Sequence, residues 1–101
     1  MYLQYVNAMT FEWDGAKNQT NRRKHGLDLA DAHVVFTGRM LTFEDPRQSG
    51  DEPRYLTVGT LAGRMVIIAH TLRGDATRVI SMRKANARER ARYQERSGES
   101  R

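Results

Sequence analysis

The chain contains no cysteine. This absence excludes a disulfide framework, a thiolate zinc site and a cysteine nucleophile. No apolar run approaches the roughly 18 residues that a membrane span requires, and the N-terminus has no basic-then-apolar signal peptide. We therefore expect a cytoplasmic protein that has no contact with a membrane.

Metal-binding patterns are also missing. No group of His, Asp and Glu has the spacing of metal ligands, so we predict that the protein binds no metal. The 101 residues allow one domain with one thin core and leave no room for a cofactor-binding domain. We expect the protein to need no cofactor.

Positive charge is abundant. The net charge is +5, and 14 of the 17 basic residues are arginine. The planar guanidinium group matches phosphate and stays charged at any working pH. The composition therefore favours a polyanionic partner, either nucleic acid or an acidic protein. The alternative is that the arginine content reflects a GC-rich genome.

Hydrophobic periodicity predicts an α+β fold. Helical spacing dominates before residue 40, and strand-like alternation follows it. Asp14 and Gly26 suit the N-cap and C′ positions of a helix over 15–25 that has almost no apolar residue. The expected order is β-α-α-β-β-β-β-α, with a four-stranded antiparallel meander and the helices packed on one face. The expected strands cover residues 10–13, 40–44, 54–60, 64–71 and 76–83, and the helices cover residues 15–25, 28–37 and 84–96.

We divide the chain into three parts. Residues 1–9 form an N-terminal leader, which is an upstream start, an added remnant or a pairing arm. Residues 10–96 form the folded domain. Residues 97–101 form a C-terminal tail that we expect to be frayed.

The segment FEWDGAKNQTNRRKHGLDLADAHVVF at residues 11–36 resembles the signature of the BrnT family. That signature runs from an aromatic residue and Asp through Lys-Asn, Asn and Lys-His-Gly to a short helix ending in Val-Phe. Later pieces agree in order and spacing: Glu-Pro-Arg-Tyr, Val-Gly, Gly-Arg, Thr-x-Arg-Gly, Arg-Val-Ile-Ser and Arg-Lys-Ala. The resemblance covers residues 11–95. The chain departs from the family at its leader and at Met82, where the family more often has a small residue.

The resemblance implies a fold like that of the RelE toxins. It also implies a ribonuclease toxin of a type II toxin–antitoxin system, which cleaves RNA by 2′-OH attack without a metal and so inhibits translation and growth. A co-expressed BrnA-type antitoxin would neutralise the toxin. Operator DNA would be bound only through the antitoxin complex.

Metal-independent RNA cleavage needs a base, an acid, cations around the phosphate and groups that orient the nucleotide. Lys24 and His25 end the first expected helix, where the negative end of the helix dipole favours the imidazolium form. Asn18 and Asn21 share a helix face with His25 and are candidates for substrate binding. The alternative is a capping histidine beside packing-neutral asparagines.

Arg64 begins the most hydrophobic expected strand, and Arg83 ends the last one. Because antiparallel neighbours run in opposite directions, we expect Arg64 and Arg83 to meet at one end of the sheet. Two converging guanidinium groups would form a phosphate site. The alternative is that both are solvated arginines at strand ends.

Other candidates lie outside these two groups. Glu52 is a possible general base, and the residues leave open whether His25 or Glu52 is the base or the acid. Tyr55 is a candidate for stacking a nucleotide base. On the last helix, Tyr93 is a candidate for catalysis and Arg88 for substrate binding. Solvated surface positions are the alternative for Glu52 and Arg88. We interpret His70, which alternates with apolar residues, as a core histidine.

Two functions remain open. The first is an endoribonuclease toxin in which His25, Arg64 and Arg83 act on the scissile phosphate, together with Lys24, Glu52 and Tyr93. The second is a non-catalytic module that binds nucleic acid or an antitoxin as a co-repressor. The Lys-His pair at a helix end favours the first, because a binding module needs cations but no acid.

Overall fold

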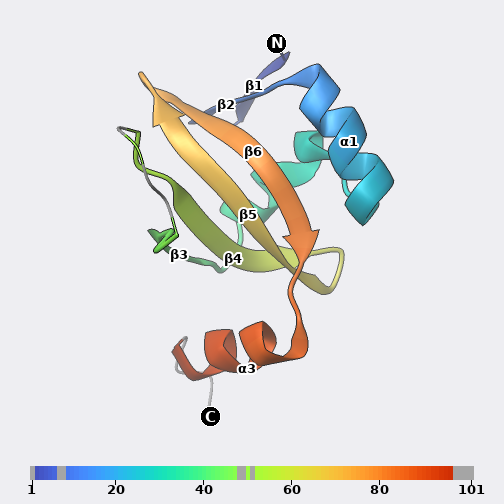
Figure 1. The fold of residues 1–101 in the computed structure, drawn as a ribbon, viewed down its shortest axis with the longest axis vertical. Helices are drawn as coiled ribbons and strands as arrows, with labels where there is room; N and C mark the ends of the chain where they lie inside the picture. The colour runs from blue at the N-terminus through green and yellow to red at the C-terminus, as the bar shows by residue number, and fades with distance from the viewer. Residues whose placement is uncertain (1, 7–8, 48–49, 51, 97–101) are drawn as a thin grey trace.

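The computed structural model describes residues 2–6, 9–47, 50 and 52–96. These residues form a mixed six-stranded sheet with three α-helices and a 3-10 turn (Figure 1). The strands are β1 Tyr2–Val6, β2 Met9–Trp13, β3 Leu41–Glu44, β4 Tyr55–Leu61, β5 Arg64–Arg73 and β6 Ala76–Lys84. The helical elements are α1 Gly15–His25, η1 Leu29–Asp31, α2 Ala32–Phe36 and α3 Ala87–Arg96. The prediction of an α+β fold is confirmed.

The strand order in the sheet is β1-β2-β6-β5-β4-β3. Strands β3 to β6 pair antiparallel in succession, which confirms the predicted meander. Strand β2 pairs parallel with β6, from Thr10↔Ala76 to Trp13↔Val79. The sequence analysis did not predict this pairing, because alternation identifies a strand without identifying its neighbour.

The predicted leader contains a strand. β1 pairs antiparallel with β2, from Tyr2↔Trp13 to Val6↔Met9. The Tyr2 ring stacks on the ring of Trp13 with centroids 5.8 Å apart. This pairing agrees with the interpretation of the segment as a pairing arm, and the predicted element order lacks this strand. The predicted tail, residues 97–101, lies outside the described residues.

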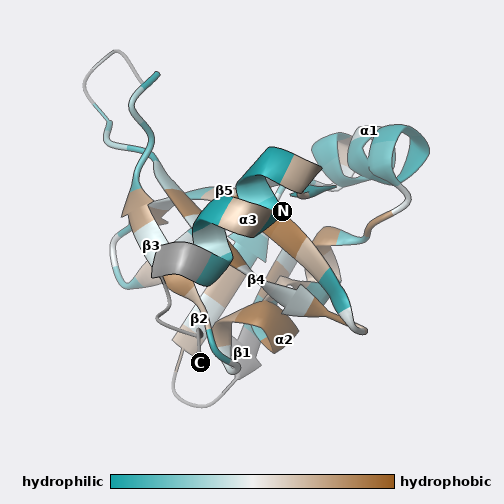
Figure 2. Cartoon of the chain, turned by 90° about the horizontal axis from the view of Figure 1, so that it is seen from below, coloured by the Kyte–Doolittle hydropathy of each residue, from teal (hydrophilic) through white to brown (hydrophobic). Residues whose placement is uncertain are grey.

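Strand β5 is buried on both sides of the sheet, because Val66, Ile67 and Ile68 are each at most 5% exposed. One side, here called the α2 face, consists of Phe11, Trp13, Leu29, Ala32, Val35, Val66, Ile68, Val79 and Met82. The other side, the α3 face, consists of Val58, Ile67 and Ala85, against which Leu56, Met65 and Tyr93 pack. Tyr93 belongs to α3, which lies in front of the sheet in Figure 2. The prediction that all helices pack on one face is therefore wrong, because β5 needs apolar cover on both sides.

Helix α1 covers an edge of β6 and not an apolar face (Figure 1). Strand β2 pairs only with the first part of β6, up to Val79, so the backbone edge at Met82 is left to α1. The buried Asn21 side chain accepts a hydrogen bond from the Met82 N–H (3.0 Å) and donates to the Met82 carbonyl (3.0 Å). It also donates to the Leu27 carbonyl at 2.9 Å. The Asn21 amide thus satisfies both backbone groups of Met82, which a neighbouring strand would otherwise pair with.

A second asparagine fixes the segment after α1. The Asn18 side chain donates to the Asp28 carboxylate and accepts from the Leu29 N–H, both at 2.8 Å. Asp28 is the N-cap of η1, and Leu29 is part of the α2 face. Both asparagines therefore attach α1 to the rest of the fold, which explains how a helix without an apolar stripe is held in place.

We predict that Asn21→Ala lowers the free energy of unfolding by about 3 kcal/mol, because it leaves the buried N–H and C=O groups of Met82 without partners. Urea denaturation followed by circular dichroism measures this change. Gln19→Ala is the matched control, since Gln19 is exposed on the same helix. Equal stabilities of the two variants would show that the Asn21 contacts carry no net stabilisation.

His70 lies in the core, as the sequence analysis predicted, and is 5% exposed. Its Nε2 is 2.7 Å from the hydroxyl oxygen of Thr57, and its ring contacts those of Phe36 and Tyr55. Its Nδ1 is buried and has no partner among the described residues. Burial lowers the pKa of His70 to about 4, so the neutral ring is the folded-state form.

Because the unfolded chain binds a proton on this histidine below about pH 6.5, the stability that neutral His70 contributes is present above that pH. We predict that it is lost as the pH falls from about 6.5 to about 4, by up to about 3 kcal/mol. Unfolding curves of the parent and of His70→Gln across this range test the effect. The variant should show a shallower pH dependence, and parallel curves would contradict the assignment.

Candidate functional site

A groove of about 430 Å³ lies between α3 and the sheet. Its apolar floor comes from the α3 face of β4 and β5, and its polar residues come from α3, the end of β6 and the loop after β3. The groove is lined by Phe43, Asp45, Pro46, Arg47, Leu56, Val58, Ile67, Arg83, Glu89, Arg92 and Tyr93. Three guanidinium groups and one phenol therefore surround a partly apolar hollow.

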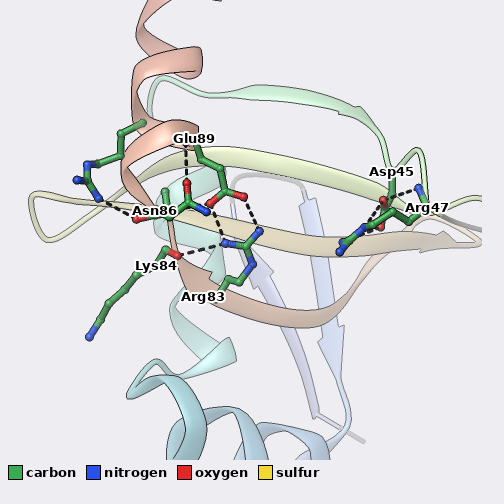
Figure 3. Close-up of polar contacts among 8 residues, drawn as sticks. Asp45, Arg47, Arg83, Lys84, Asn86 and Glu89 are labelled. Atoms are coloured by element: carbon green, nitrogen blue, oxygen red, sulfur yellow. Dashed lines mark hydrogen bonds and ion pairs between the residues drawn. The ribbon is translucent and has the colours of Figure 1, made fainter.

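Arg83 and Glu89, which both line the groove, form an ion pair (Figure 3). The Arg83 guanidinium donates from Nη1 to Oε1 at 2.9 Å and from Nη2 to Oε2 at 2.7 Å. The hydrogen bonds from Arg83 lower the pKa of Glu89 to about 2, and those to Glu89 raise the pKa of Arg83. Glu89 therefore stays anionic, and its bidentate contact fixes the guanidinium plane.

The Glu89 carboxylate also caps the first turn of helix α3. The Asn86 side chain accepts from the Glu89 N–H at 2.8 Å, and Glu89 Oε1 accepts from the Asn86 N–H at 2.9 Å. These reciprocal bonds form a capping box, which sets the helix start later than residue 84. Ala85 is tied to β5 by its N–H, which donates to the Met65 carbonyl at 3.0 Å. The short link therefore fixes α3, and with it Tyr93, relative to Arg83.

The Lys24–His25 pair lies in a different cleft. It ends α1 at Gly26, which has a left-handed φ of 69° and donates to the Arg22 carbonyl. A cleft of about 320 Å³ lies between α1 and β6 and is lined by Ala16, Lys17, Thr20, Asn21, Lys24, His25, Ile80 and Ser81. It shares no lining residue with the groove beneath α3. The structure therefore does not bring His25 and Arg83 into one cleft.

The expected meeting of Arg64 and Arg83 is not found. Arg83 pairs with Ile67, which lies on the α3 face. Arg64 is three residues before Ile67 in β5, so alternation directs it to the α2 face together with Val66. The two arginines do lie toward the same end of the sheet, but on opposite faces of it.

The remaining candidates are scattered. Glu52 pairs with Arg73 at 3.1 Å, near the β5–β6 turn and far along the sheet from Arg64. Tyr55 stacks on His70, with centroids 5.9 Å apart. Arg88 is exposed on α3 and does not line the groove. Asn18 and Asn21, expected to bind substrate, use their amides to hold α1.

Several groove residues were not predicted from the sequence. Arg47 pairs with Asp45 at 3.2 Å in the loop after β3, and its backbone N–H and side chain lower the pKa of Asp45. Arg92 and Glu89, which lie on the same helix as the predicted Tyr93, were not among the expected site residues. The Asn86-x-x-Glu89 spacing of a capping box was a signal for the helix start. No local signal identified Arg47, because only the folded sheet brings its loop beside α3.

The described residues contain no group of three or more His, Cys, Asp or Glu side chains that could hold a metal ion. In the same part of the chain, no helix has the length and apolar character needed to cross a membrane. The chemistry that the groove offers comes from cations and a phenol. Such a set suits the binding of a phosphate and the transfer of a proton.

Comparison with protein families identifies a family for most of the chain. The model described as "Ribonuclease toxin, BrnT, of type II toxin-antitoxin system" matches residues 13–89, which is well over half of the chain. The match includes α1, the whole meander and the Arg83–Glu89 pair. No curated protein matches the chain.

We predict that Glu89→Gln lowers the free energy of unfolding by about 1 to 2 kcal/mol, a range that allows for solvent screening of the partly exposed pair. Glutamine keeps the capping box but lacks the charge that pairs with Arg83. Glu52→Gln is the control, because its pair with Arg73 is about half exposed and should contribute little.

The measurement is chemical denaturation at several pH values. The depressed pKa of Glu89 contributes stability that is present above about pH 4.5 and is lost as the pH falls towards about 2. Glu89→Gln should remove this part of the acid dependence. If Glu52→Gln destabilises the protein as much as Glu89→Gln, the Arg83–Glu89 pair has no special role in holding α3.

Proposed function

The chain belongs to the BrnT family of ribonuclease toxins of type II toxin–antitoxin systems, and from this premise we propose that it cleaves RNA in the groove between α3 and the sheet. The observation that carries the proposal is the convergence of Arg47, Arg83 and Arg92 with Tyr93 around one hollow. Of the candidates expected from the sequence, Arg83 and Tyr93 are the two that line this groove.

The proposed reaction is attack of a ribose 2′-OH on the adjacent phosphorus. The 2′-OH proton passes to solvent, the bond from phosphorus to the leaving 5′-oxygen breaks, and that oxygen takes up a proton, which yields a cyclic phosphate and a free 5′-hydroxyl. Negative charge grows on the phosphate oxygens in the transition state, and permanently charged guanidinium groups stabilise it. We propose that these groups provide the positive charge that other nucleases take from a metal ion.

Tyr93 is the groove residue best suited to proton transfer. Asp45 and Glu89, the other ionisable acids in the groove, have pKa values lowered by Arg47 and Arg83. A carboxylate of very low pKa is a weak base near neutral pH. The Tyr93 hydroxyl donates weakly to the Arg39 carbonyl at 3.5 Å, a contact that substrate can replace. We therefore assign the protonation of the 5′-oxygen to Tyr93 and the positioning of Arg83 to Glu89.

Membership of this family implies an antitoxin partner and an RNA target. We propose that the partner is a BrnA-type antitoxin, that operator DNA is bound only through the complex, and that the toxin acts in the cytoplasm, where translated RNA lies. The antiparallel meander followed by a helix that completes the groove supports a RelE-like fold.

We predict that Arg83→Ala lowers the single-turnover rate of RNA cleavage by about 10²–10³, because one charged contact to the transition state is lost. Arg73→Ala removes the same charge at the other end of β5 and should keep the rate. EDTA should not inhibit the parent protein. His25→Ala should change the rate by less than about tenfold, since general acid catalysis by His25 would require about 10² or more.

Three results would contradict parts of this proposal. Loss of cleavage in His25→Ala with an unaffected Arg83→Ala would move the catalytic centre to the cleft beside α1. Inhibition by EDTA would contradict metal independence. A parent protein that binds RNA or antitoxin but never cleaves RNA would favour the non-catalytic co-repressor. Melting temperatures measured on each variant exclude unfolding as the cause of lost activity.

A further inference from the structure

We propose that the exposed cations of α1, some of which line the cleft beside β6, form a second RNA-binding site, which holds the phosphate backbone of the substrate away from the groove where it is cleaved. The proposal rests on the proposed function in one respect, since it takes RNA as the substrate. It concerns a separate surface, because the α1 cleft and the α3 groove have no lining residue in common.

The charge of α1 is of one sign. Its sequence GAKNQTNRRKH contains Lys17, Arg22, Arg23, Lys24 and His25 but no Asp or Glu. The four Lys and Arg side chains are exposed. Among the described residues, none of the four lies within ion-pair distance of a carboxylate. By contrast, Arg47, Arg73, Arg78 and Arg83 are each paired with an acid. A helix surface with unpaired cations attracts a polyanion more strongly than a surface of mixed charge.

The attachment of α1 leaves these cations accessible. Asn18 and Asn21 bind the body of the protein through one side of the helix. Lys17 and Lys24 are exposed and line the cleft beside Asn21, together with Thr20 and Ser81. Arg23 is exposed and is not part of this cleft. Ammonium groups beside hydroxyl donors form a site for phosphate oxygens. Along the axis, Lys17 and Arg23 are about 9 Å apart, which allows contacts with more than one phosphate.

Further cations connect this surface with the groove. Lys84 pairs with Val66, so alternation places it on the α2 face together with Arg64. The neighbouring Arg83 points to the α3 face, and the Lys84 side chain extends away from the Arg83–Glu89 pair (Figure 3). Positive charge therefore continues around the end of β6, from the groove towards α1. A single RNA strand can follow this path with its scissile phosphate at Arg83.

The chemistry of the surface favours RNA over an acidic protein segment. The exposed residues of α1 are basic or polar, and Ala16 is the one exposed apolar residue of the helix. A docked protein helix needs apolar anchors as well as charge. A phosphate backbone needs only cations and hydrogen-bond donors.

The test compares two variants that lose equal charge. Lys17→Gln/Arg23→Gln changes α1 while leaving the Lys24–His25 pair intact, and glutamine preserves helix propensity. Arg54→Gln/Arg73→Gln removes two exposed cations elsewhere. The probe is a mixed-sequence RNA oligonucleotide with 2′-O-methyl groups, which binds without being cleaved by 2′-OH attack. Dissociation constants are measured from about 50 to 200 mM salt, where phosphate contacts dominate the salt dependence.

We expect the α1 variant to bind more weakly and the slope of log K against log salt to become shallower by about 1.4, at about 0.7 for each lost contact with a single strand. On cleavable RNA its KM should rise with an unchanged kcat, because the contact is made equally in ground and transition states. The control should keep the parent slope.

Equal slopes for the two variants would overturn the second site, even if cleavage and its loss in Arg83→Ala confirm the proposed function. Unchanged RNA binding with weakened neutralisation by the antitoxin would overturn it as well and would assign α1 to the protein partner. Absence of cleavage in the parent, with a shallower slope in the α1 variant, would contradict the proposed function and leave the RNA-binding surface in place.

Discussion

The contact between the Asn21 amide and the backbone of Met82 determines where α1 lies. Strand β2 is too short to cover the edge of β6 beyond Val79, and a buried backbone edge without partners is unfavourable. Asn21 satisfies both Met82 groups and also the Leu27 carbonyl that follows the helix. Since three directional hydrogen bonds do the anchoring, α1 needs no apolar stripe, and the rest of its surface is free to carry cations.

The last two residues of β6 are basic and point to opposite faces of the sheet. Consecutive residues of a strand point in opposite directions, so Arg83 faces the groove beneath α3 while Lys84 faces the α2 side. Glu89 then serves two partners at once, because it caps α3 and holds the Arg83 guanidinium. The position of Tyr93 follows from this arrangement, since two residues separate α3 from β6 and the first turn of α3 is fixed to the strand end.

Local signals were sufficient for most of the elements, although not for β1, and insufficient for the site. Asp14 and Gly26 gave both ends of α1, and period-2 patterning gave the meander. The pairing of β2 with β6 depends on contacts between residues far apart in sequence, which no local pattern encodes. Arg64 and Arg83 were correctly expected near one end of the sheet, but a register offset of three residues sends them to opposite faces. The polar stripe of Asn18 and Asn21 was noticed and assigned to substrate, whereas hydrogen bonds within the fold explain it.

The two cationic surfaces differ in how their charge is balanced, and this difference suits different tasks. Arg83 is held by Glu89, so its field is partly cancelled at long range while its orientation is fixed at short range. The Lys and Arg side chains of α1 are exposed and form no ion pair among the described residues, so their field extends into solvent without a carboxylate to fix their orientation. A long-range field accelerates encounter with a polyanion, whereas stabilisation of a transition state needs fixed charges at a defined place. The fold therefore separates capture from chemistry, with α1 suited to the first and the Arg83 groove to the second.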